Sequence, residues 1–315
     1  MHIPDGFLDT KTATVSAVLA GSGVGIALAQ VRRHLARRKV PLLGLAAAFV
    51  FAAQMLNFPV MGGTSGHLIG GVLSAILLGP SAAVIALTCV LVVQCFLFAD
   101  GGVTALGANI LNMAVINPVV GYGIYRLVRH WLTGTRGLIV ATAFASWCAT
   151  VVTATVCAGQ LAFAGTMPWG LAFPAMANIH MLIGLGEGLI TALVITAIVR
   201  VRPELVAESL QPTIVRRAGE FTGLGVLVAL GLALFIAPFA CPWPDGLEKV
   251  AATLGVESAA PVLPAPLADY QVPGLKSAVA TTAVAGTVGT LAAFGLSFLL
   301  ARLLTPKQTN ETRFS

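Results

Sequence analysis

The chain has 315 residues, of which 57% are hydrophobic and only 10% carry charge, against about a quarter charged in a typical soluble domain. This balance excludes an ordinary soluble domain and indicates that the lipid bilayer is the solvent. The net charge of +6 does not indicate nucleic-acid binding, because the basic residues lie in short tracts between apolar segments and not on one amphipathic face.

Apolar stretches long enough to cross about 30 Å of hydrocarbon recur along the whole chain. We predict an all-α, polytopic membrane protein with about nine transmembrane helices, near residues 12–31, 41–60, 68–80, 82–99, 105–125, 138–163, 172–199, 221–240 and 276–301. The stretch from His67 to Ala99 is short for two straight spans. Its Gly79-Pro80 pair is typical of either a tight turn or a kink.

The basic residues predict the orientation of the chain. With two crossings between His67 and Asp100 and the N-terminus outside, 15 of the 18 Lys and Arg residues lie on the inner side. A single crossing there would turn the later basic tracts outward, against the bias towards positively charged inner loops. We therefore expect the N-terminus outside and the C-terminus in the cytoplasm, in a multi-pass protein of the cell inner (plasma) membrane. The first residues lack a basic region and include Asp5, so we expect no signal-peptide cleavage and a retained Met1.

A polar stretch divides the chain into two predicted domains. We expect a seven-helix membrane domain at residues 1–200, a cytoplasmic linker at 201–220 and a two-helix accessory domain at 221–315. The accessory domain carries an outer loop with the sequence Pro-Asp-Gly-Leu-Glu at 244–248.

The first two residues carry a specific metal-binding chemistry. A free α-amine, the amide nitrogen of His2 and the His2 imidazole can close two fused chelate rings around one ion, so that three nitrogens lie in one plane. Square-planar nitrogen geometry suits Ni²⁺ or Cu²⁺, whereas Zn²⁺ prefers a tetrahedron. Pro4 has no amide hydrogen, so the backbone chelate cannot run past residue 3. His67 is on the same predicted side, after the Gly-rich turn 62–66, and its imidazole can fill the fourth corner. Taken alone, His2 is also compatible with an accident of the N-terminus.

A histidine and an acid share one face of the seventh predicted span. His180 and Glu187 are seven residues apart, and an acid near the middle of a bilayer is a functional hypothesis by default. The alternatives are a relay for protons or ions and a hydrogen-bonded Glu187 that ties helices together. We predict that four residues support the metal ligands or line the path of the ion: Asn57, Ser65, His180 and Glu187.

Small residues recur every four positions in the first span, at Ala13, Ala17, Gly21 and Gly25. Such a ladder permits close helix approach, either within this chain or with a separate membrane subunit. The sequence contains no Gly-Lys-Ser/Thr nucleotide loop, so ATP-driven transport would need partner chains.

Three motifs carry a resemblance to a known family: Met-His-Ile-Pro-Asp-Gly-Phe-Leu at 1–8, Asn-Phe-Pro-Val at 57–60 leading into Gly-Thr-Ser-Gly-His at 63–67, and Ile-Gly-Leu-Gly-Glu-Gly at 183–188. Together they resemble the substrate-capture (S) component of nickel/cobalt energy-coupling-factor (ECF) transporters, the CbiM/NikM family, over residues 1–200. The later part, with its PDGLE motif and Asp-Tyr-Gln-Val-Pro-Gly at 269–274, resembles the NikN-like accessory component of the nickel branch.

The resemblance implies a ligand set and partners. Its metal ligands correspond here to Met1, His2 and His67, and the accessory domain favours Ni²⁺ over Co²⁺ as the transported substrate, with no organic cofactor. The implied partners are a membrane coupling (T) subunit and cytoplasmic ATPase subunits, so the chain is expected to be a transporter subunit and not an enzyme. The alternative is a stand-alone secondary metal-ion carrier or channel that uses His180 and Glu187 as a relay.

Overall fold

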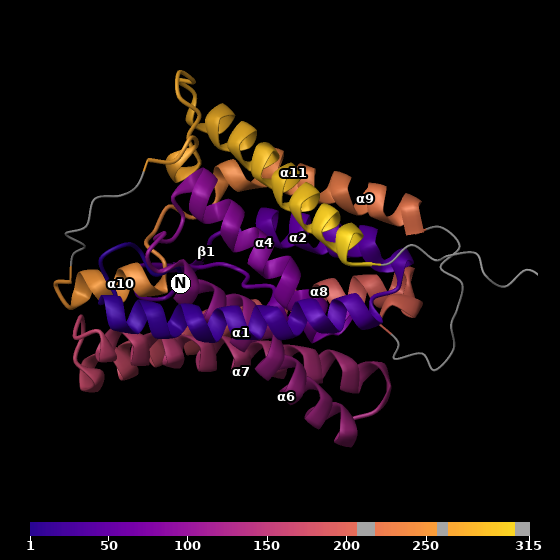
Figure 1. Cartoon of the computed structure of the whole chain (residues 1–315), viewed down its shortest axis with the longest axis horizontal. Helices are drawn as coiled ribbons and strands as arrows, with labels where there is room; N and C mark the ends of the chain where they lie inside the picture. The colour runs from indigo at the N-terminus through magenta and orange to yellow at the C-terminus, as the bar shows by residue number, and fades with distance from the viewer. Residues whose placement is uncertain (207–217, 257–263, 306–315) are drawn as a thin grey trace, which may run out of the picture.

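The computed structural model describes residues 1–206, 218–256 and 264–305, and these residues are mostly helical (Figure 1). Within them, six helical runs are long and apolar enough to cross a membrane. They are α1 (Thr10–His34), α4 (Pro80–Phe98), α7 (Gly134–Phe163), α8 (Trp169–Val201), the run Phe221–Phe239 that includes most of α9 (Ala218–Gly231), and α11 (Ala278–Leu304). The predicted class, a polytopic helical membrane protein, is confirmed. The count of nine spans and their orientation stay predictions, and the linker predicted at 201–220 falls mostly outside the described residues.

The remaining predicted spans are interrupted helices. The fifth is a continuous helical run in which α5 (Leu106–Asn109) widens into a π-helical segment (Ile110–Ile116) and continues as α6 (Asn117–Trp131). The third is helical only in its second part, α3 (Gly71–Leu78), which follows the non-helical residues 67–70. Gly79 has φ +89° and Pro80 begins α4, which packs back against α3. The Gly-Pro pair therefore makes a turn.

A short β-hairpin replaces the end of the second predicted span. Helix α2 (Val40–Gln54) stops six residues before the predicted end at residue 60. Pro59 lacks an amide hydrogen and disfavours helix for the residue before it, so the helix does not continue through residues 58 and 59. The following strands, β1 (Phe58–Val60) and β2 (Thr64–Gly66), pair antiparallel with Phe58 opposite Gly66. Gly62 and Gly63 both have positive φ in the connecting turn, a conformation that favours glycine. Residue 67 follows β2 directly.

The accessory helices pack on the first domain along α2. Figure 1 shows α9 and α11 lying alongside α2. On α11, a Cβ at Gly289 would lie 2.0 Å from Cζ of Phe51, so only glycine allows this approach. Between them in sequence, the short helix α10 (Gly246–Thr253) packs against α8 and β2. Both parts of the chain therefore meet next to the hairpin.

The small-residue ladder of α1 divides into two parts. Ala17 packs against Gly107, where an added Cβ would come within 2.5 Å of the Ala17 Cα. Ala13 is half-buried, whereas Gly21 and Gly25 are exposed, and a Cβ at either would meet no atom within 4 Å. Ala17 thus takes part in packing within the chain, whereas Gly21 and Gly25 leave a smooth exposed surface on α1.

Candidate metal centre

The first residues of the chain run into the protein and are pinned there by hydrogen bonds. The amide of Ile3 donates to Oδ1 of Asn109 at 2.8 Å, and the Ile3 carbonyl accepts from Asn109 Nδ2 at 3.0 Å and from the Gly102 amide at 2.9 Å. Asn109 lies at the junction of α5 and the π-helical segment, a type of irregularity that is frequent at functional sites. Met1 is consequently only 4% exposed.

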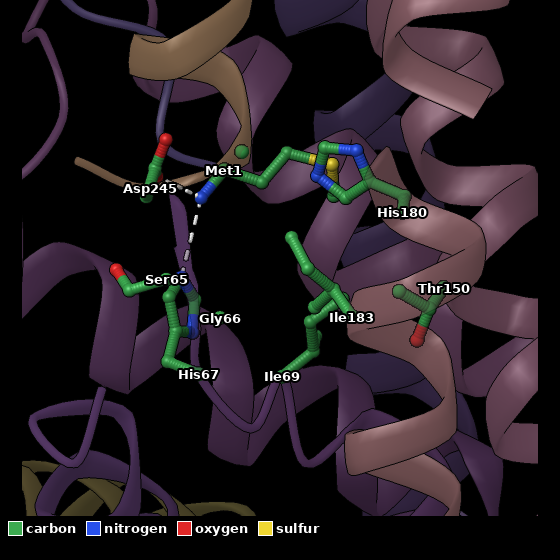
Figure 2. Close-up of a pocket in the computed structure, with 10 residues that line it drawn as sticks. Met1, Ser65, Gly66, His67, Ile69, Thr150, His180, Ile183 and Asp245 are labelled. Atoms are coloured by element: carbon green, nitrogen blue, oxygen red, sulfur yellow. Dashed lines mark hydrogen bonds and ion pairs between the residues drawn. The ribbon is translucent and has the colours of Figure 1, made fainter. Parts of the chain in front are cut away.

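The terminal amine lies between an imidazole and a carboxylate. Its nitrogen is 3.2 Å from Nε2 of His67 and forms an ion pair with Asp245 of the PDGLE motif. Figure 2 shows the amine directed at these two groups, while the Met1 side chain extends towards His180. A small pocket surrounds the group, and its lining includes Ser65, Ile69 and Ile183. The structure therefore brings Met1 and His67 together, although they are 66 positions apart.

His2 completes the cluster from the other side. The centroids of the His2 and His67 rings are 5.6 Å apart, and the His2 side chain is 8% exposed. In the described part of the chain no group of three or more His, Cys, Asp or Glu side chains could hold a metal ion. The groups gathered here are the terminal amine and the imidazoles of His2 and His67.

Hydrogen bonding limits how far a main-chain chelate can extend. The Ile3 amide donates its hydrogen to Asn109, so this nitrogen does not extend the chelate. Pro4 has no amide hydrogen at all. The candidate nitrogen ligands are thus the Met1 amine, the His2 amide and the imidazoles of three histidines: His2, His67 and His180.

The electrostatics keep the imidazole neutral and the amine paired. Burial, with the nearby amine as the next cause, lowers the pKa of His67 to about 3, so its ring carries a lone pair at neutral pH. Burial also lowers the pKa of the Met1 amine, but the Asp245 carboxylate more than offsets this and the net shift is upward. The pKa of Asp245 is correspondingly low, because the ammonium outweighs the effect of burial.

The PDGLE loop is held by the hairpin through main-chain contacts. The Pro244 carbonyl accepts from the Ser65 amide at 2.8 Å, the Trp243 carbonyl accepts from the Ser65 hydroxyl at 2.7 Å, and the Cys241 amide donates to the Asn57 carbonyl at 2.9 Å. Asn57 and Ser65, predicted to support the metal, thus bind the accessory loop, and Ser65 also lines the pocket.

Asp245 is a site residue that sequence reasoning missed. It is the N-cap of α10, where its Oδ1 accepts from the Glu248 amide at 2.9 Å and the Glu248 side chain accepts from the Asp245 amide at 2.8 Å. The Asp-x-x-Glu spacing of this capping box is visible in the sequence. No local pattern in the sequence shows that its second oxygen, Oδ2, contacts the Met1 amine 244 positions away.

The two polar residues of α8 lie at different levels. His180 lines the pocket, and its Nδ1 lies 2.8 Å from the Met176 carbonyl. Glu187 accepts from the amides of Ile69 at 3.0 Å and Gly70 at 3.1 Å, and from the Thr150 hydroxyl at 3.2 Å. The carboxylate therefore anchors the non-helical segment that follows His67, which favours the role of tying segments together.

We expect Glu187→Ala to lower the free energy of unfolding by about 2–6 kcal/mol, because two buried amides lose their acceptor at about 1–3 kcal/mol each. Glu187→Gln keeps one acceptor oxygen, so its stability should lie between those of Glu187→Ala and the wild type. Thermal unfolding in detergent micelles measures the stability of the two variants. Wild-type melting temperatures in both variants would show that Glu187 does not anchor this segment and would favour a relay.

Fold and site together define a class: a multi-pass helical membrane protein in which a buried N-terminal amine and two imidazoles form a nitrogen-rich pocket closed by an accessory domain. The chain belongs to the family of the cobalt uptake substrate-specific transmembrane region, whose model matches residues 2–205, and residues 219–306 match the PDGLE domain. The predicted family and accessory domain are confirmed.

Relatives and solved structures agree with this assignment. A protein of Archaeoglobus fulgidus, provisionally named as the fused nickel transport protein NikMN, is 37% identical over 96% of this chain and 98% of its own length. The fused nickel transport protein NikMN of Rhodobacter capsulatus is 36% identical over 73% of this chain and 71% of its own, and the cobalt transport protein CbiM of Streptomyces coelicolor is 33% identical over 72% and 94%. A crystal structure of a truncated transition metal transporter, 34% identical, matches 64% of this chain and 99% of its own with a TM-score of 0.58. The predicted transport class, as opposed to an enzyme, is confirmed.

Proposed function

We propose that this protein is the substrate-binding membrane component of an ATP-driven importer, and that it captures Ni²⁺ in preference to Co²⁺. The ion is bound in a plane by the Met1 amine, the amide and imidazole of His2, and the imidazole of His67. The observation that carries the proposal is the 3.2 Å approach of the Met1 amine to Nε2 of His67 inside a buried pocket. No other pair in the described structure joins the chain terminus to a neutral imidazole.

The donor set supports the choice of metal. Four nitrogens in one plane match the geometry that Ni²⁺ and Cu²⁺ adopt, whereas Mg²⁺ and Ca²⁺ require oxygen ligands. The preference for nickel over cobalt is supported by the relatives that carry both regions, which are named as nickel transport proteins. Relatives named for cobalt match 65% to 72% of this chain, against 96% for the fused nickel relative of Archaeoglobus fulgidus.

The proposed partners are a membrane coupling (T) subunit and cytoplasmic ATPase subunits. They are supported by the absence of a nucleotide-binding loop from the sequence. For the coupling subunit we propose the face of α1 that presents Gly21 and Gly25, since these two glycines leave its surface open to close helix approach.

Metal titration of the purified protein tests the proposal. We expect one Ni²⁺ per chain by calorimetry, with the visible absorption of a square-planar nitrogen complex and an affinity at least about 10-fold above that for Co²⁺ or Zn²⁺. Absence of nickel binding, or a tetrahedral cobalt spectrum with equal affinity, would overturn it. Uptake of radioactive nickel in cells should require the ATPase subunits, and uptake that follows the proton gradient instead would favour a secondary carrier.

A single methyl group at the PDGLE turn should disturb the site. A Cβ at Gly246 would lie 2.7 Å from Cε1 and 2.9 Å from Nε2 of His180, so Gly246→Ala should move Asp245 off the amine and weaken nickel binding about 10-fold, as loss of a ligand's supporting partner does. Adding His180→Ala removes the closest of these contacts and leaves only that with Cδ1 of Ile183 at 2.9 Å, so affinity should be partly restored. Gly231→Ala, which meets no atom within 4 Å, is the matched control. A double variant as weak as the single one would show that crowding is not the cause.

A further inference from the structure

A second set of contacts links the accessory domain to the first two residues of the chain, and it begins at Tyr270. The Tyr270 hydroxyl donates to Oδ2 of Asp100 at 2.6 Å. The other carboxylate oxygen, Oδ1, lies 3.4 Å from Nδ1 of His2. Tyr270, Asp100 and His2 thus form a chain of contacts that starts in the accessory domain and ends at the second residue.

Asp100 and Tyr270 are both held in place by further contacts. The Asp100 amide donates to the Gln94 carbonyl at 3.1 Å, which fixes it at the end of α4. The Tyr270 ring stacks on Phe98 with centroids 4.6 Å apart and an interplanar angle of 19°. Tyr270 and its neighbour Asp269 have φ of 59° and 52°, which disfavour residues with a Cβ. The fold maintains this strained turn, and the turn places the phenol on Asp100.

His2 Nδ1 is buried and makes no hydrogen bond to the described residues, although Oδ1 of Asp100 lies 3.4 Å away. In the proposed chelate it is Nδ1 that binds the metal, since this atom closes the second ring from the His2 amide. A half-turn of the imidazole about Cβ–Cγ turns Nδ1 away from Asp100 and moves Nε2 to the edge that faces the carboxylate. A metal-binding histidine commonly donates its other ring N–H to a carboxylate, which fixes the orientation of the ring.

We propose that Asp100 is a positioning residue for His2 and that Tyr270 of the accessory domain holds it in place. This inference rests on the proposed function. Asp100 orients the imidazole by accepting its second ring N–H, and its charge partly balances that of the ion. Through Tyr270, the accessory domain sets the affinity of a site whose proposed ligands all lie in the first domain.

Two conservative variants separate this role from simple support of the fold. Tyr270→Phe removes only the hydroxyl and keeps the stacking on Phe98, and Asp100→Asn keeps the shape and removes the charge. For both we expect one Ni²⁺ per chain with affinity reduced about 10–100-fold, a shifted visible absorption band of the nickel complex, and a melting temperature close to that of the wild type. Asp269→Asn, an equal charge change at the neighbouring exposed residue, should leave affinity and spectrum unchanged.

The outcomes separate this inference from the proposed function. A wild type that binds no nickel overturns both. A wild type that binds nickel, with Tyr270→Phe and Asp100→Asn equal to it in affinity and absorption band, overturns this inference alone. Variants that melt earlier but give the wild-type band would show that Tyr270 and Asp100 only join the two domains.

Discussion

Replacing His67 with alanine is expected to weaken nickel binding by more than about 100-fold, which exceeds the usual loss for an outer-shell partner. The substitution removes the imidazole whose Nε2 faces the terminal amine, and the remaining chelate then holds the ion with three nitrogens. The side chain is only 8% exposed, so no nearby surface group can replace it. Calorimetric titration of the purified variant measures the loss, and uptake of radioactive nickel in cells that contain the partner subunits checks its consequence.

Two other histidines control for this variant. His130→Ala changes an exposed residue at the end of α6, and His180→Ala changes the other imidazole of the same pocket. We expect both to bind nickel within a few-fold of the wild type. If His180→Ala loses as much affinity as His67→Ala, the proposed ligand set is wrong, and a carrier that uses α8 becomes the better account.

Extending the N-terminus should have the largest effect, namely loss of measurable nickel binding. A tag of several residues joined ahead of Met1 converts the amine into an amide, which removes one ligand and breaks the chelate ring between the amine and the His2 amide. It also leaves the Asp245 carboxylate without its ammonium partner and adds atoms where Met1 is 4% exposed. The experiment compares a protein with a cleavable N-terminal tag before and after protease treatment that restores Met1.

The same tag at the C-terminus provides the control, because it leaves the amine free. We expect the C-terminally tagged protein and the cleaved protein to bind one nickel ion each. Mass spectrometry must confirm that the cleaved chain begins at an unblocked Met1. Wild-type affinity in the uncleaved N-tagged protein would rule out the amine as a ligand.

The sequence was sufficient for the parts of the fold that depend on local composition. Six long apolar helices follow directly from hydropathy, and the distribution of basic residues predicts Met1 and His67 on the same side of the membrane. The hairpin at 58–66 was not predicted, because the apolar residues around Pro59 continue the pattern of α2 and hide its end at Gln54.

The supporting residues could not be predicted because their contacts join distant segments. Asp245 meets Met1, and Tyr270 meets Asp100 across 170 positions, and no local pattern records either pairing. Asn57 and Ser65 were expected beside the metal on account of their motif. In the structure they hold the accessory loop, largely through main-chain groups that any residue type supplies, and Ser65 also lines the pocket, so their predicted role at the metal stays a prediction.

The buried pairing of Met1 with Asp245 also sets a schedule for biosynthesis. The amine leaves the ribosome first, whereas its carboxylate partner follows 244 residues later, which takes about 12 to 50 s at about 5–20 residues per second. Any blocking group, such as formyl, must be removed while the terminus is still accessible to a processing enzyme. Because the accessory loop closes over the terminus only after that interval, the order of synthesis itself protects the maturation of the site.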